Sequence, residues 1–167
     1  STNKLPTIVF LRTGKGFEEK EFEGLTTKKE FSESDLAIID IDSDGDNDVV
    51  SVAGGYENQK ESDYVHYLYE NFNGTFQRTA LPVPPFPASV VKPFDFDHDG
   101  DIDLFIGSRI KKGMFPHADP SWLIINDKGK LSEDYTKQFD LGMVTDALWS
   151  DYDNDGWSDL VLAGEWM

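Results

Sequence analysis

Three acidic segments of the sequence carry the residue types that bind a hard metal ion. Residues 40–48, 95–103 and 151–159 each fit the pattern D-x-D-x-D-G-x-x-D. Carboxylates at the first, third and fifth positions of such a loop converge on one point, and a glycine at the sixth position permits the sharp turn that brings in the seventh carbonyl and the ninth carboxylate. This spacing predicts an oxygen cage for calcium in each loop.

We expect one Ca²⁺ in each loop, three ions in total. The predicted side-chain ligands are the four aspartates that recur in every loop: Asp40, Asp42, Asp44 and Asp48; Asp95, Asp97, Asp99 and Asp103; and Asp151, Asp153, Asp155 and Asp159. The seventh residues, which would offer backbone carbonyls, are Asp46, Asp101 and Trp157. Crowded carboxylates repel one another by about 1 kcal/mol per pair near a surface. Three divalent ions would offset six of the 17 net negative charges.

Two other kinds of metal loop fit the sequence less well. An EF-hand requires a bidentate Glu at its twelfth position, where these loops have Ser51, Ile106 and Leu162. Magnesium demands near-ideal octahedral geometry and keeps several waters, which suits a flexible, carboxylate-rich loop less well than calcium does. For a single loop, the alternative to a metal site is an acidic turn exposed to solvent. Three copies of the pattern at nearly equal spacing disfavour this alternative.

The loops recur at spacings of 55 and 56 residues, and strand-like segments recur with them. Short β-branched and aromatic runs flank each loop, at residues 36–41 and 49–53, 90–96 and 102–106, and 144–149 and 160–163. Hairpin signals with Asn73-Gly74 and Lys128-Gly129 at the turns follow the first two loops, and a similar segment at residues 9–17 precedes them. Only residues 18–30 hold a weak helical period. Each repeat therefore predicts about four antiparallel strands, the size of a β-propeller blade.

We therefore predict an all-β fold of β-propeller blades, about three blades' worth in total and most simply a partial propeller. Residues 1–33 would hold the end hairpin of a preceding blade and a connection, and residues 34–88 and 89–142 two full blades with a calcium loop each. Residues 143–167 would hold the first two strands of a third blade with its loop. Because a ring usually needs four to eight blades, we expect either a fragment of a longer protein or a homodimer that closes a six-bladed ring.

Composition excludes several classes of function. With 32 Asp and Glu residues against 15 Lys and Arg, the formal net charge is −17, which argues against binding to nucleic acid because phosphates would be repelled. The sequence has no cysteine, so disulfides, thiolate catalysis and cysteine-ligated zinc are excluded. No run approaches the roughly 18 apolar residues of a membrane helix, so no membrane insertion is expected. The lack of a signal segment is expected of a mature or truncated chain.

No enzymatic activity is expected from the sequence. Every conspicuous carboxylate belongs to a repeated loop, whereas a catalytic residue should break the repeat. Glu165 and the acidic cluster at residues 56–63 escape the pattern, but no nucleophile or base accompanies them. The long connection at residues 107–120, which carries Arg109, is a candidate binding segment, although packing over the neighbouring blade is its more ordinary role. The tryptophans could stack on a sugar, although packing between blades is their more ordinary role: Trp122, Trp149, Trp157 and Trp166.

The three loops and the hairpins between them resemble the FG-GAP/VCBS repeats, whose blades also build the integrin alpha-chain propeller. Gly54, Gly107 and Gly164 fall where that family ends its second strand. Residues 107–116 and 122–127 are similar to bacterial relatives of cartilage acidic protein. The resemblance implies a calcium-bearing propeller that is extracellular, on the cell surface or periplasmic and serves adhesion, with a protein or glycan ligand. The alternative is a purely structural scaffold within a larger surface protein or carbohydrate-active enzyme.

Overall fold

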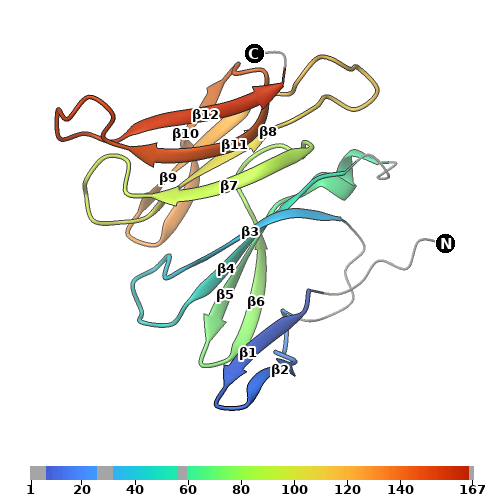
Figure 1. Cartoon of the computed structure of the whole chain (residues 1–167), viewed down its shortest axis with the longest axis vertical. Coiled ribbons are helices and arrows are strands. Elements are labelled where there is room, and N and C mark those ends of the chain that lie inside the picture. The colour runs from blue at the N-terminus through green and yellow to red at the C-terminus, as the bar shows by residue number, and fades with distance from the viewer. Residues whose placement is uncertain (1–6, 26–31, 56–59, 166–167) are drawn as a thin grey trace.

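The computed structural model describes residues 7–25, 32–55 and 60–165, which form antiparallel β-sheets (Figure 1). Within these residues there is no α-helix, and the 3₁₀ turn Glu61–Tyr64 (η1) is the one helical element. The predicted all-β class is therefore confirmed. No helix in this part of the chain is long and apolar enough to cross a membrane.

Two of the sheets have four strands each. The first has the order β3 (Glu33–Ile39), β4 (Asp48–Ala53), β5 (Tyr67–Phe72) and β6 (Thr75–Ala80). The second repeats this order with β7 (Ala88–Phe94), β8 (Asp103–Ser108), β9 (Ser121–Asp127) and β10 (Lys130–Phe139). All neighbouring strands in these sheets pair antiparallel. Both sheets have the form of a propeller-type blade.

Two-stranded sheets lie beside the four-stranded ones. The hairpin of β1 (Val9–Thr13) and β2 (Gly16–Lys20) lies next to β3–β6, and the pair β11 (Met143–Ser150) and β12 (Asp159–Glu165) lies next to β7–β10 (Figure 1). The weak helical prediction for residues 18–30 is wrong at its start, because residues 18–20 pair with β1. Residues 26–30 lie outside the described residues. The blade boundaries drawn from the repeat stay a prediction.

Both predicted hairpin turns are confirmed. Asn73-Gly74 joins β5 to β6, and Lys128-Gly129 joins β9 to β10. All four residues have positive φ, as the type I′ turns of two-residue hairpins require. The sequence signal was sufficient because a tight turn depends on its own residues.

The apolar core lies between the sheets. Strand β7 contacts β3 on one side and β11 on the other. One cluster packs the two four-stranded sheets together around the fully buried Ile41, Leu104 and Ile106. A second joins β7–β10 to β11–β12 through Phe105 and Val144. This packing sets the inner strands side by side, so the acidic loops that follow them lie along one edge of the molecule, at the left of Figure 1.

Candidate metal centres

Each acidic loop connects the inner strand of a sheet to the next strand, β3 to β4, β7 to β8 and β11 to β12. The backbone enters the left-handed region twice in each loop. At the fourth position φ is 60°, 61° and 62° for Ser43, His98 and Asn154. At the sixth position φ is 96°, 98° and 93° for Gly45, Gly100 and Gly156. The sharp turn expected of the sixth-position glycine is present in all three loops.

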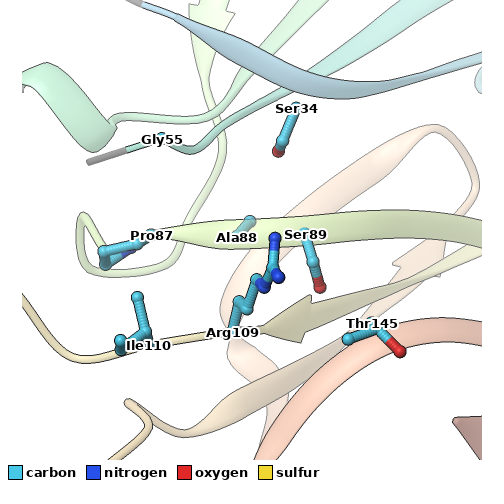
Figure 2. A pocket seen from close by; sticks show the side chains of 8 residues that line it. All are labelled: Ser34, Gly55, Pro87, Ala88, Ser89, Arg109, Ile110 and Thr145. Atoms are coloured by element: carbon cyan, nitrogen blue, oxygen red, sulfur yellow. The ribbon is translucent and has the colours of Figure 1, made fainter. Parts of the chain in front are cut away.

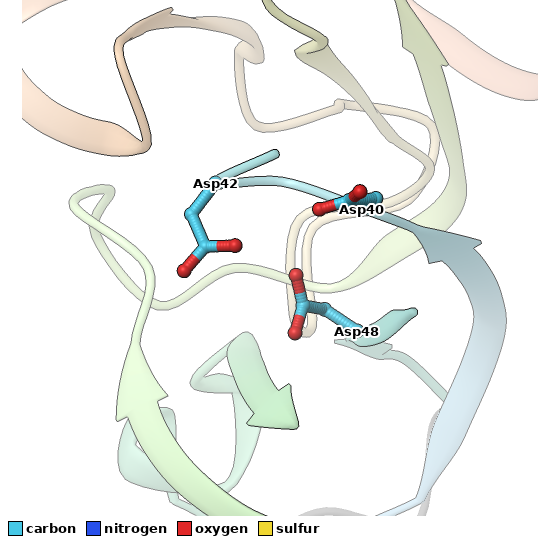
Figure 3. A group of neighbouring side chains, drawn as sticks. All are labelled: Asp40, Asp42 and Asp48. Carbon is cyan, nitrogen blue, oxygen red and sulfur yellow. The ribbon is translucent and has the colours of Figure 1, made fainter. Parts of the chain in front are cut away.

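Carboxylates converge in every loop. In each set below, one ligand atom from each of three residues lies within 4.8 Å of the other two. The sets are Asp40, Asp42 and Asp48; Asp95, Asp97 and Asp99; and Asp151, Asp153 and Asp159. Figure 3 shows the first set, whose carboxyl groups face a common point. The structure therefore brings together nine of the predicted side-chain ligands, three to a loop.

The same backbone hydrogen bonds shape all three loops. The sixth-position amide donates to one oxygen of the first aspartate, at 3.0, 3.1 and 3.1 Å. The fifth-position amide donates to the other oxygen of that aspartate, at 3.1, 3.1 and 3.0 Å. The seventh-position amide donates to the fifth aspartate, at 2.8, 2.9 and 2.8 Å. Since each carboxylate oxygen has a second lone pair, these bonds hold the carboxylates without using up their capacity as ligands.

This set of donors fits a calcium ion. The converging groups are all carboxylate oxygens, the hard ligands that calcium prefers in flexible coordination. None of the ion pairs between described residues includes an aspartate of the three loops. The negative charge of each loop is therefore not balanced by an ion pair within the described part of the chain.

The ninth aspartate has a second task that the sequence reasoning missed. Asp48 and Asp103 are buried, and each accepts backbone hydrogen bonds on both oxygens. Asp48 accepts from Ile41 at 2.9 Å and from Asn71 in β5 at 2.8 Å, and Asp103 accepts the equivalent pair at 2.7 and 2.8 Å. Burial raises the pKa of both carboxyls, and the neighbouring loop aspartates raise it further. A recurring Asn shortly before each hairpin turn was the available signal.

The side chains at the seventh position point away from the metal set. Asp46 accepts from the amide of Asn73 at 3.0 Å, and Asp101 accepts from the amide of Lys128 at 2.7 Å, so each loop is tied to the hairpin turn of its own sheet. In the third loop this position is Trp157, whose ring stacks on His98 of the second loop with centroids 4.5 Å apart. The carbonyl ligand role of these residues stays a prediction.

One further carboxylate lies near the first loop. Burial, followed by the charges of Asp48 and Asp42, raises the pKa of Glu70 in β5. The second sheet has the apolar Ile125 at the equivalent place. The first loop therefore has a more acidic neighbourhood than the repeat pattern alone predicts.

The tryptophans divide into packed and exposed residues. Trp122 packs against the first core cluster, and Trp149 stacks on Phe94 with centroids 5.2 Å apart. Trp157 is 56% exposed, and Trp166 lies outside the described residues. Packing between sheets, rather than a sugar platform, accounts for Trp122 and Trp149.

A separate hollow of about 250 Å³ lies near the starts of the inner strands (Figure 2). Ser34, Ser89 and Thr145 line it from β3, β7 and β11, and each hydroxyl donates to a backbone carbonyl. Arg109 also lines it and pairs with Glu165 at 2.9 Å. The three hydroxyls and Nη2 of Arg109 already have partners in the fold, whereas Nε of Arg109 is buried without one. The hollow holds none of the predicted metal ligands.

Comparison with known proteins agrees with the sheets and loops described above. Residues 40–106 match the family model of the FG-GAP-like repeat. The match runs from the first aspartate of the first loop into β8, so it includes two of the three acidic loops. A search of curated proteins found no match to the chain. Residues 40–106 are thus similar to the FG-GAP-like repeat, and the four-stranded sheets have the form of β-propeller blades.

Proposed function

We propose that each acidic loop binds one Ca²⁺. The observation that carries this proposal is that all three loops share one backbone geometry and one pattern of bonds to the first aspartate, and that three carboxylates lie within 4.8 Å of one another in each. The first, third, fifth and ninth aspartates would hold the ion, together with the seventh carbonyl. Bound calcium supplies the positive charge that turns carboxylate repulsion into attraction. Because only the folded loop offers this ligand set, binding stabilises the fold.

We further propose that the calcium-bound segment is an adhesion-type module outside the cytoplasm that binds a protein or glycan. The FG-GAP-like repeat supports this role. So does the expected affinity, since extracellular calcium modules bind at roughly 10⁻⁴ to 10⁻³ M. No catalytic activity is part of the proposal, because the converging carboxylates of the described residues belong to repeated loops. A purely structural scaffold is the alternative, and it predicts no saturable ligand binding in millimolar calcium.

Calorimetric titration of the metal-free chain with calcium tests the metal part directly. We expect about three bound ions and, at a calcium concentration 100 times the Kd, a gain of about 2.7 kcal/mol in folding free energy per site. Asp97→Ala should reduce the stoichiometry by one ion. Asp134→Ala, which removes an exposed acid outside the loops, is the control and should leave it unchanged. A titration without heat, together with a melting temperature that chelator does not change, would contradict the proposal.

A further inference from the structure

Asn126 in β9 is fully buried and contacts two acidic loops. Its Nδ2 donates to the carbonyl of Ile41, in the first loop, at 2.8 Å and to the carbonyl of Ile102, in the second loop, at 3.2 Å. Its backbone N–H donates to Asp103 of the second loop at 2.8 Å. One residue therefore joins loops that belong to different sheets.

The equivalent residue of the first sheet, Asn71, reaches only its own sheet. Its Nδ2 donates to the carbonyl of Asn47 at 3.0 Å, and its Oδ1 accepts from the amide of Gly74 at 2.7 Å. The sheets differ because the second hairpin turn packs against the first loop. A Cβ atom on Gly129 would lie 2.8 Å from the Cβ of Asp42, whereas one on Gly74 would meet nothing within 4 Å.

The amide of Asn126 gives both of its hydrogens to loop carbonyls. Its Oδ1 is buried and accepts no hydrogen bond within the described residues. Such an oxygen is costly, because a buried acceptor loses its bonds to water. The two Nδ2 bonds are thus the contacts through which this side chain stabilises the fold, and they depend on both loops holding their shape.

We propose that Asn126 is a positioning residue that couples calcium binding at the first loop to calcium binding at the second. The inference rests on the proposed calcium function. Ile41 lies between Asp40 and Asp42, and Ile102 adjoins Asp103, so both carbonyls move with metal ligands. Ordering one loop fixes the amide, and the amide then restrains the other loop before its ion binds. The coupling factor must be equal in both directions.

Calcium titration of the ¹⁵N-labelled chain separates the loops. The amides of Gly45, Gly100 and Gly156 each donate to the first aspartate of their own loop, so each reports one site. Asp97→Ala disables the second loop. We expect this substitution to raise the calcium midpoint at Gly45 about fivefold or more. The midpoint at Gly156 should rise less, because the third loop contacts the second through the exposed Trp157 ring.

Reciprocal and matched variants complete the test. Asp42→Ala should raise the midpoint at Gly100 by the same factor. In an Asn126→Leu background, Asp97→Ala should change the Gly45 midpoint by less than about twofold, whereas an Asn71→Leu background should keep the full effect. If Asn126→Leu does not fold, the test uses the NMR signals of the Asn126 side-chain amide. In the Asp97→Ala protein these signals must shift as calcium binds to the first loop.

The outcomes separate the two proposals. The coupling is overturned if Asp97→Ala leaves the calcium midpoint at Gly45 unchanged. It is also overturned if the side-chain signals of Asn126 do not shift when calcium binds to the first loop. Either result leaves calcium binding intact. Glycine signals that never respond to millimolar calcium overturn calcium binding itself, and the coupling with it.

Discussion

Asp103 and Asp97 belong to the same loop but have different surroundings. Asp103 is 1% exposed and accepts two backbone hydrogen bonds that join β9 to the loop. Asp97 is exposed and accepts no hydrogen bond from described residues, although its carboxylate belongs to the converging set. Asp103 therefore supports the fold whether or not a metal binds, whereas Asp97 makes no such contact among the described residues.

We expect Asp103→Ala to destabilise the chain even in chelator, by about 2 kcal/mol, because the buried N–H of Asn126 and the part-buried N–H of Phe96 lose their acceptor. In chelator Asp97→Ala should change stability by less than about 0.5 kcal/mol, as surface substitutions do, and in calcium it should remove the share of the stabilisation that the second loop contributes. Urea unfolding in chelator and in calcium measures both effects. Equal losses for the two variants in chelator would contradict this division of roles.

The residue-scale predictions succeeded where the determinants are local. The converging carboxylates and the turn at the sixth position follow from nine consecutive residues. The bridging amide of Asn126 could not be predicted in the same way, because its partner Ile41 is 85 residues away in sequence. That contact depends on how one sheet packs on the next, which no local spacing encodes.

At the scale of elements, two hairpin turns of the same type meet different neighbours. Gly74 and Gly129 have φ of 93° and 79°, so alanine at either position pays the cost of the left-handed region, about 1 kcal/mol. Only Gly129 packs against a neighbouring loop, at Asp42. The repeat predicted both turns correctly, but not that one of them packs against the acidic loop of the preceding sheet.

We therefore expect Gly129→Ala to cost about 1–3 kcal/mol more than Gly74→Ala, the usual penalty of overpacking. Since the obstructing atoms are the backbone and Cβ of Asp42, the first loop must shift, and its calcium affinity should fall as well. Thermal unfolding and calcium titration of both variants measure this difference. Equal effects of the two substitutions would mean that the turn does not support the loop.

At the scale of the whole molecule, two apolar faces remain open at opposite ends of the row of sheets. Leu36 and Ile38 on β3 are 42% and 70% exposed, and Leu148 and Val161 on β11 and β12 are 55% and 40% exposed. Equivalent positions of the repeats are found by counting from the first aspartate of each loop. The position of Leu36 is occupied in the second repeat by the buried Val91. The position of Val161 is occupied in the first two repeats by the buried residues Val50 and Phe105. The open faces are thus the two halves of an interface that the chain forms internally between consecutive sheets.

A second copy of the chain offers the complementary half of each face, so we expect head-to-tail association of two chains into a six-bladed ring. Light scattering in millimolar calcium should give twice the chain mass of 18.8 kDa. Ile38→Lys or Leu148→Lys should each return the mass to one chain, because a charge would be buried in the joint. Tyr135→Lys, at an exposed site on β10, is the control and should leave the dimer intact.

A single-chain mass for the unmodified protein would reject the ring and leave both faces to partners other than a second copy. If the mass instead rises beyond two chains as the concentration increases, the two faces do bind each other, but successive chains form an open chain of subunits and not a closed ring.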